Sequence, residues 1–113
     1  MPALRRSHLA LPMTPAQICA AAADWYEHPG HELITEQFLD GPLGAPRAEI
    51  TAACGSGAFY LVCESAVDRD RALGAIKRLL GKSLVAWTDY DCKSKAHMIR
   101  MLRKAAERLE SAA

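Results

Sequence analysis

The chain has 113 residues, of which half are hydrophobic and 24% are charged, and its formal net charge is +1. This length suits one compact domain, and the composition excludes disordered and collagen-like chains. A net charge so close to zero predicts by itself no affinity for nucleic acid or for an anionic membrane. We expect residues 1–13 to form a tail, either flexible or ending in a short edge strand, and residues 14–113 to form a single α+β domain.

The charges are distributed unevenly along the chain. Residues 1–67 contain three Lys or Arg and seven Asp or Glu, a net charge of −4, whereas residues 68–113 contain eleven and six, a net charge of +5. This asymmetry predicts a basic side of the molecule, built mainly by the C-terminal helices.

The cysteines and the N-terminal sequence indicate the compartment. No two of the four cysteines form C-x-x-C, and their scatter is unlike a disulfide framework, so we expect reduced thiols. His8 and Pro12 interrupt the apolar N-terminal stretch, which argues against a secretory signal. No run approaches the ~20 apolar residues that span a membrane. We therefore expect a cytoplasmic protein without a membrane partner.

The first predicted helix begins after Thr14, a hydroxyl N-cap, with Pro15 at the first helical position and Gln17 able to reach back to the cap. Residues 31–39 fit both helical and strand periodicity, and we favour a strand. Residues 40–46 contain two glycines and two prolines and are expected to form a loop.

The next stretch, residues 47–65, is expected to form the central β-hairpin. Gly55-Ser56-Gly57 would supply the positive-φ positions of a tight turn. Residues 58–63 contain no charge, which is typical of a central strand.

A second helix is expected to start between residues 65 and 68 and to end at Leu80, with Gly81 as its left-handed stop. Its apolar stripe would consist of Ala72, Leu73, Ile76, Leu79 and Leu80. Residues 83–88 read as a further strand, and Asp91 as the N-cap of a final helix from Cys92 to about Glu110. The predicted fold is an antiparallel sheet of three to four strands with helices packed on it, in the order α-β-β-β-α-β-α.

The final predicted helix carries a cationic row at Arg100, Lys104 and Arg108, spaced i, i+4, i+8. Like charges at this spacing disfavour a helix, so the row suggests a surface for phosphate or for an acidic protein partner. A merely solvated helix face is the alternative. The expected binding residues are Lys93, Lys95, His97, Arg100, Met101, Lys104 and Arg108.

Parts of the sequence resemble a double-stranded RNA-binding domain. The resemblance consists of the order α-β-β-β-α, the loop at residues 41–47, and Lys93-Ser94-Lys95-Ala96 opening a basic final helix. It implies that the first helix and the loop contact successive minor grooves while the lysines hold phosphates. Residues 66–88 have no counterpart in that family.

Two patterns in the sequence suggest a reactive thiol and a metal site. Cys92 at a helix N-terminus near two lysines is where the pKa of a thiol can fall. Asp89 and Asp91 form D-x-D, a spacing that can chelate Mg²⁺ or Mn²⁺. Turn and helix-cap roles explain both aspartates without a metal, and no nucleophile motif or phosphate loop accompanies the cysteine. We expect no catalysis, no cofactor and no bound metal.

The sequence therefore predicts a small non-enzymatic binding protein, an inhibitor or adaptor of the kind encoded by phages and mobile elements. It would dock on a macromolecular partner, foremost a protein, through the basic face of its C-terminal helix. RNA or DNA binding is the alternative, and a small Cys- or metal-dependent enzyme is a third. Homodimerisation through exposed sheet edges or the cationic helix is also open.

Overall fold

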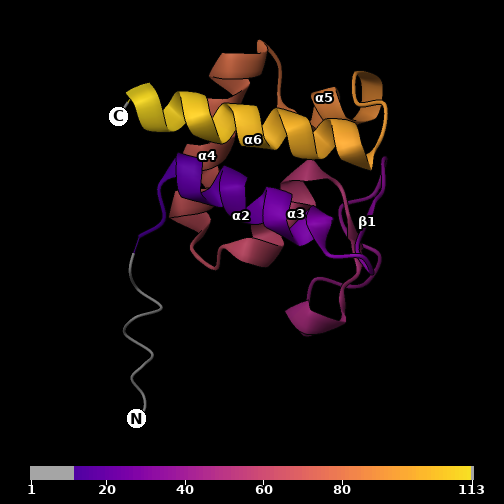
Figure 1. Cartoon of the computed structure of the whole chain (residues 1–113). Coiled ribbons are helices and arrows are strands. Elements are labelled where there is room, and N and C mark those ends of the chain that lie inside the picture. Colours follow the sequence, from indigo (N-terminus) through magenta and orange to yellow (C-terminus); the bar gives the residue numbers. More distant parts are fainter. Residues whose placement is uncertain (1–11, 113) are drawn as a thin grey trace.

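The computed structural model of the protein describes residues 12–112, so most of the predicted tail, residues 1–11, lies outside the described residues. In the described part the chain is mainly helical, and Figure 1 shows α6 lying along α2 while α4 crosses behind both. The elements are α2 (Pro15–Glu27), β1 (Glu32–Leu33), the 3₁₀ helix η1 (Arg47–Glu49), β2 (Ala52–Ala53), α3 (Gly55–Val62), α4 (Ala66–Leu80), α5 (Leu84–Tyr90) and α6 (Lys95–Ala112).

The predicted antiparallel sheet of three to four strands is wrong. Among the described residues, β1 and β2 form a two-stranded parallel sheet in which Glu32 lies opposite Ala52 and Leu33 opposite Ala53. Residues 31–39, predicted as a strand, contribute β1 and an isolated antiparallel bridge from Leu39 to Ala53. The three strands between two helices that a double-stranded RNA-binding domain requires are therefore absent from residues 12–112.

The uncharged run predicted as the central strand is helix α3. Cys54 is its N-cap, because the Cys54 Sγ accepts the Gly57 N–H at 3.4 Å. Residues Gly55 to Phe59 are all buried. A helix that is buried on every side has no polar face, and its sequence cannot then be distinguished from a buried strand by periodicity.

The glycine pair of the predicted hairpin turn has another role at the start of α3. A Cβ on Gly57 would lie 2.1 Å from the Phe38 carbonyl oxygen, and a Cβ on Gly55 would lie 2.8 Å from the Thr88 Oγ1. Neither glycine has a positive φ. These positions need glycine because other segments pass close to the helix backbone.

The second wrongly predicted strand, residues 83–88, lies in α5. The Ser83 Oγ accepts the Ala86 N–H at 3.1 Å and caps the helix. Thr88 is fully buried, and its hydroxyl donates to the Leu84 carbonyl at 2.8 Å, which satisfies the polar group inside the core. Leu84, Trp87 and Thr88 are buried at helical spacing, so burial outweighs the β-propensity of this segment.

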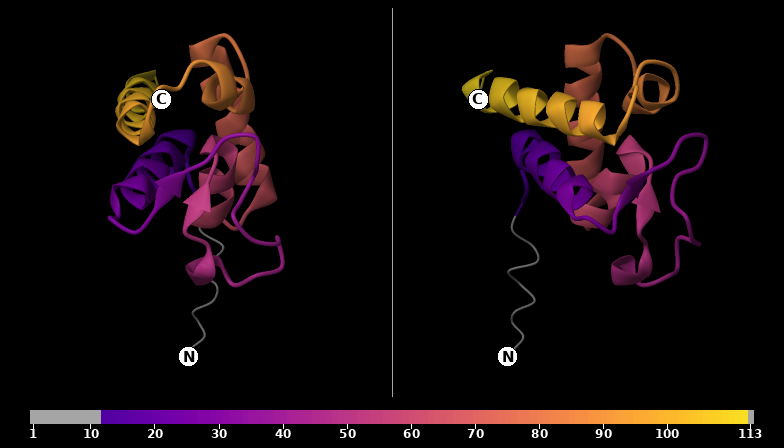
Figure 2. Two further views of the ribbon diagram at one scale, coloured as in Figure 1. Left: turned by 90° about the vertical axis from the view of Figure 1, so that its right-hand side faces the viewer. Right: turned by 45° about the vertical axis from the view of Figure 1, so that its right-hand side comes forward.

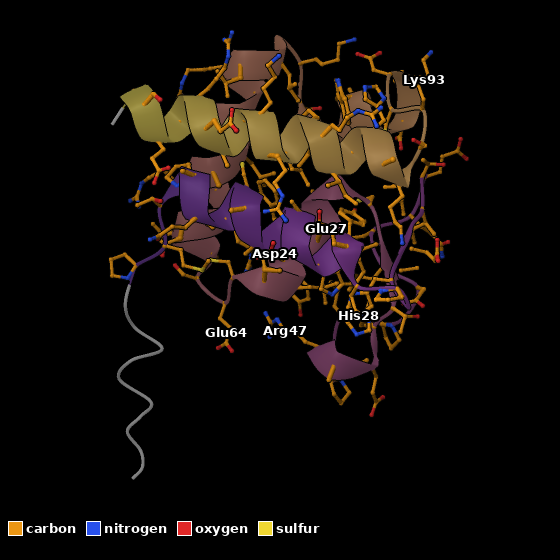
Figure 3. All side chains as sticks on the ribbon, in the orientation of Figure 1. Asp24, Glu27, His28, Arg47, Glu64 and Lys93 are labelled. Carbon is orange, nitrogen blue, oxygen red and sulfur yellow. The ribbon has the colours of Figure 1, made fainter. Side chains whose placement is uncertain are left out.

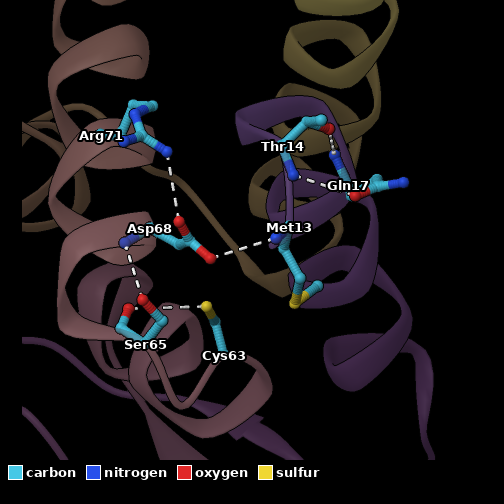
Figure 4. Close-up of polar contacts among 7 residues, drawn as sticks. All are labelled: Met13, Thr14, Gln17, Cys63, Ser65, Asp68 and Arg71. Carbon is cyan, nitrogen blue, oxygen red and sulfur yellow. Dashed lines mark hydrogen bonds and ion pairs between the residues drawn. The ribbon is translucent and has the colours of Figure 1, made fainter. Parts of the chain in front are cut away.

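The predicted starts of α2 and α4 are confirmed. Thr14 and Gln17 form a capping box, with bonds of 3.1 and 2.9 Å. The Ser65 Oγ accepts the Asp68 N–H at 3.1 Å at the start of α4, and Gly81 ends this helix with a φ of 78°. The Asp68 carboxylate accepts the Met13 N–H at 3.1 Å and so joins the beginnings of the two helices (Figure 4).

The main core lies between the first and last described helices. With α6 seen nearly end-on in Figure 2 (left), α2 and α6 lie together on one side and α4 on the other. Met98, Leu102 and Ala105 of α6 are buried in one cluster with Ile18 and Ala22 of α2. The fully buried Tyr26 donates its hydroxyl to the Ala53 carbonyl at 2.8 Å and joins α2 to β2.

Candidate docking site between helices α4 and α6

The last helix begins at Lys95, three residues later than predicted. The Ser94 Oγ accepts the His97 N–H at 3.0 Å, and the His97 Nδ1 accepts the Lys93 N–H at 3.0 Å, so Ser94 caps α6. Asp91 is not this N-cap; it ends α5 and pairs with Lys82 at 2.9 Å. Lys93 therefore precedes α6.

The structure divides the seven predicted binding residues into two groups. The group at the start of α6 has structural partners: the Lys95 Nζ donates to the His31 carbonyl at 2.7 Å, and the His97 ring lies 5.1 Å from that of Trp87. Lys93 is exposed, and with Lys95 it lines an open polar hollow of about 500 Å³ beside residues 32–37. These residues do not join the cationic row.

The second group meets a different element, the C-terminal end of α4. Met101, Lys104 and Arg108 line an apolar groove of about 290 Å³ whose other lining residues are Leu79, Leu80 and Ala105. Arg100 is exposed on the same face one turn earlier but does not line the groove. The groove continues toward the C-terminus of α6 past Glu107, Ser111 and Ala112.

The helical period explains why these side chains face α4. Met98, Leu102 and Ala105 point into the core, which fixes the rotation of α6 about its axis. On one flank, Arg103 turns toward α2 and pairs with Asp24 at 2.6 Å and Glu27 at 2.7 Å. Figure 3 labels these two acidic residues on α2. Lys104 and Arg108 lie on the opposite flank and so reach the groove.

The groove combines an apolar floor with unpaired cations. Leu79 is 38% exposed although it belongs to the apolar stripe of its helix. Lys104 and Arg108 are exposed and make no ion pair within residues 12–112. The sequence pattern predicted Leu79 as a core residue, and its exposure was missed. The adjacent pair Leu79-Leu80 could have indicated it, because two neighbouring leucines make the apolar stripe of α4 wider than the part that the core can bury.

The patterns that suggested chemistry have structural roles. Burial raises the pKa of the Cys92 thiol instead of lowering it, and its Sγ donates to the Ser94 carbonyl at 3.2 Å. The Asp89 carboxylate accepts the Glu36 N–H at 3.2 Å. Across the described residues, no three His, Cys, Asp or Glu side chains are grouped so that they could hold a metal ion.

None of the helices in residues 12–112 combines the length and apolarity needed to cross a membrane. Comparisons of the chain with models of protein families, with curated proteins and with solved structures found no match. The groove between α4 and α6 is the candidate functional site of the described residues.

Proposed function

We propose that the chain is a non-enzymatic binding protein that holds an acidic amphipathic helix of a protein partner in the groove between α4 and α6. The observation that supports this is the apolar floor, with the exposed Leu79 and the half-buried Met101, beside the unpaired cations Lys104 and Arg108. Isolated exposed apolar residues are common on protein surfaces, but an apolar groove with charged residues at its rim is typical of a docking site. Lys104 and Arg108 outweigh the one acidic residue on this rim, Glu107.

The shape of the groove favours a helical partner segment. The lining residues come from both α4 and α6, and a helical segment with apolar residues spaced by three or four positions can contact both helices at once. The rim cations would pair with Asp or Glu on the flanks of that segment, while its apolar side chains would cover Leu79 and Met101. Arg100 extends the positive potential by one helical turn and would accelerate association.

We further propose that the chain is cytoplasmic and acts as an inhibitor or adaptor. The four cysteines are free, which agrees with a reducing cytoplasm. A small inhibitor or adaptor is a suitable class, because such proteins need a rigid scaffold and one docking surface. A nucleic-acid function has weaker support, because Lys95, which would hold phosphate in that interpretation, is bound to the His31 carbonyl.

A photo-crosslinking amino acid at position 79 of the full chain tests the proposal in cells. The matched control carries the same amino acid at position 67, since Val67 is an equally apolar and even more exposed residue of α4, at 65%. The expected adduct at position 79 is a protein segment rich in Asp and Glu with apolar residues at helical spacing.

Charge reversal gives the second arm of the experiment. Lys104→Glu with Arg108→Glu should abolish the adduct at position 79, whereas Lys93→Glu, which reverses a cation outside the groove, should leave it unchanged. Identical adducts at positions 67 and 79, an adduct with RNA or with a second copy of the chain, or no adduct would each contradict the proposed partner.

A further inference from the structure

A separate cavity lies under the C-terminal end of α2 and shares no lining residue with the groove between α4 and α6. Trp25, His31 and His28 form a column of stacked rings, with centroids 4.1 Å apart for the first pair and 4.3 Å for the second. The His31 Nδ1 donates to the Trp25 carbonyl at 2.7 Å, and the His28 Nδ1 accepts the Gly30 N–H at 3.2 Å. The column therefore holds the Trp25 and His31 rings in fixed positions.

Arg47 is the cation beside this column, and its guanidinium plane is also fixed. The Arg47 Nε donates to the Tyr60 carbonyl at 3.2 Å, and its guanidinium carbon lies 4.4 Å from the Tyr60 ring centroid. Arg69 lies over the same ring at 5.1 Å. These contacts leave the two terminal nitrogens of Arg47 without a hydrogen bond or ion pair among residues 12–112.

The cavity between these groups has a volume of about 370 Å³, at the lower end of the range for small-molecule sites. Trp25, Ile50 and Leu61 contribute apolar walls, and Arg47 is its only residue with a permanent charge. Figure 3 shows that Arg47 and His28 both lie below the C-terminal half of α2. No Asp or Glu lines the cavity, so nothing in its wall neutralises the guanidinium.

We propose that this cavity binds a small monocarboxylate with an aromatic or apolar body. The two terminal nitrogens of Arg47 can donate in parallel to both oxygens of a carboxylate, which is the favoured geometry of this pair. The body of the ligand then packs between Trp25 and Leu61. One unpaired cation matches a single negative charge, whereas a phosphate monoester carries close to two.

Two sources share this chemistry: a free aromatic acid, and the C-terminal residue of a peptide. Phenylacetate represents the first and N-acetylphenylalanine the second. Titration of the ¹⁵N-labelled full chain with each probe, followed by NMR, should shift the Trp25 indole N–H and the Leu61 amide. Phenylacetamide, which has the same body without the charge, should bind at least tenfold more weakly, and phenyl phosphate should also bind more weakly than phenylacetate.

Variants of the cavity complete the test. Arg47→Gln should weaken phenylacetate binding at least tenfold, and Arg47→Lys should weaken it less, because lysine keeps the charge but not the paired donors. Leu61→Trp fills the cavity, leaves Arg47 in place and should also abolish binding. This second variant keeps the proposal testable if Arg47→Gln disturbs the fold.

The two sources are distinguished by which probe binds. Binding of phenylacetate alone indicates a free acid, and binding of N-acetylphenylalanine indicates a peptide terminus as well. Absence of binding by both acids, equal binding of phenylacetamide, or shifts at Trp25 and Leu61 that survive Arg47→Gln would overturn the proposal.

Discussion

Replacing Gly57 by alanine tests whether the start of α3 is as crowded as the structure indicates. The new Cβ would lie 2.1 Å from the Phe38 carbonyl oxygen, 3.1 Å from the Ala53 Cβ and 3.2 Å from the Leu39 Cδ2. The first distance must increase by roughly 1 Å, and the oxygen that has to move accepts the Cys54 N–H at 3.1 Å. The substitution therefore strains a backbone hydrogen bond as well as the local packing.

The expected cost follows from these contacts. Overpacking of a core typically costs about 1–3 kcal/mol, and weakening the Cys54 to Phe38 hydrogen bond adds about 1 kcal/mol. The higher helix propensity of alanine offsets up to about 1 kcal/mol. We expect Gly57→Ala to lower the free energy of unfolding by about 1–3 kcal/mol, which is a large part of the total for a domain of this size.

Urea denaturation followed by circular dichroism at 222 nm measures this change. Gly74→Ala is the matched control, because its Cβ would meet only the Arg78 Nη1 at 3.8 Å and it lies inside α4. The control should be more stable than the natural chain by about 0.5–1 kcal/mol. If Gly57→Ala were as stable as Gly74→Ala, the close approach of residue 38 to α3 would be refuted.

Two further predictions concern α2. Arg103→Gln removes the ion pairs with Asp24 and Glu27, and because these groups are well exposed the loss should be about 1 kcal/mol or less and should shrink in 0.5 M NaCl; a loss independent of salt would contradict an electrostatic origin. Burial raises the pKa of the Cys19 thiol from 9.0 to about 12. Above pH 9 the unfolded chain therefore loses this proton while the folded chain keeps it. The free energy of unfolding should then fall by about 1.4 kcal/mol per pH unit. Burial raises the pKa of Tyr26 in the same sense, which adds to the loss at higher pH. Cys19→Ala should reduce the slope in urea titrations between pH 8 and 11, and an unchanged slope would show that Cys19 does not titrate as expected.

Local signals in the sequence were sufficient to predict where α2 begins and where α4 begins and ends. Thr14 with Gln17, and Gly81 with its left-handed conformation, are features that a few neighbouring residues determine. The residues of α3 were misread because burial of a full helical turn removes the polar face that identifies a helix. The residues of α5 were misread because a helix of seven residues is too short for its period to outweigh β-prone side chains. The role of Gly57 depends on Phe38, which is distant in sequence and could not be inferred locally.

The candidate site was predictable only in part. The cationic row on α6 follows from residue spacing alone, and its use as a binding surface stays a prediction. The bond from Lys95 to the His31 carbonyl depends on how residues 31–33 pack beside α6, and the exposure of Leu79 depends on how α4 crosses α6. Both are tertiary relations, for which spacing within one helix carries no information.

The pairing of α2 with α6 has a consequence for folding during synthesis. Ile18 and Ala22 are synthesised well before Leu102 and Ala105, which belong to the same cluster. Contacts between segments so distant in sequence close late in folding. The part of α2 that packs on α6 therefore stays exposed on the nascent chain until α6 has been synthesised, even after α3 and α4 have covered the rest of the cluster.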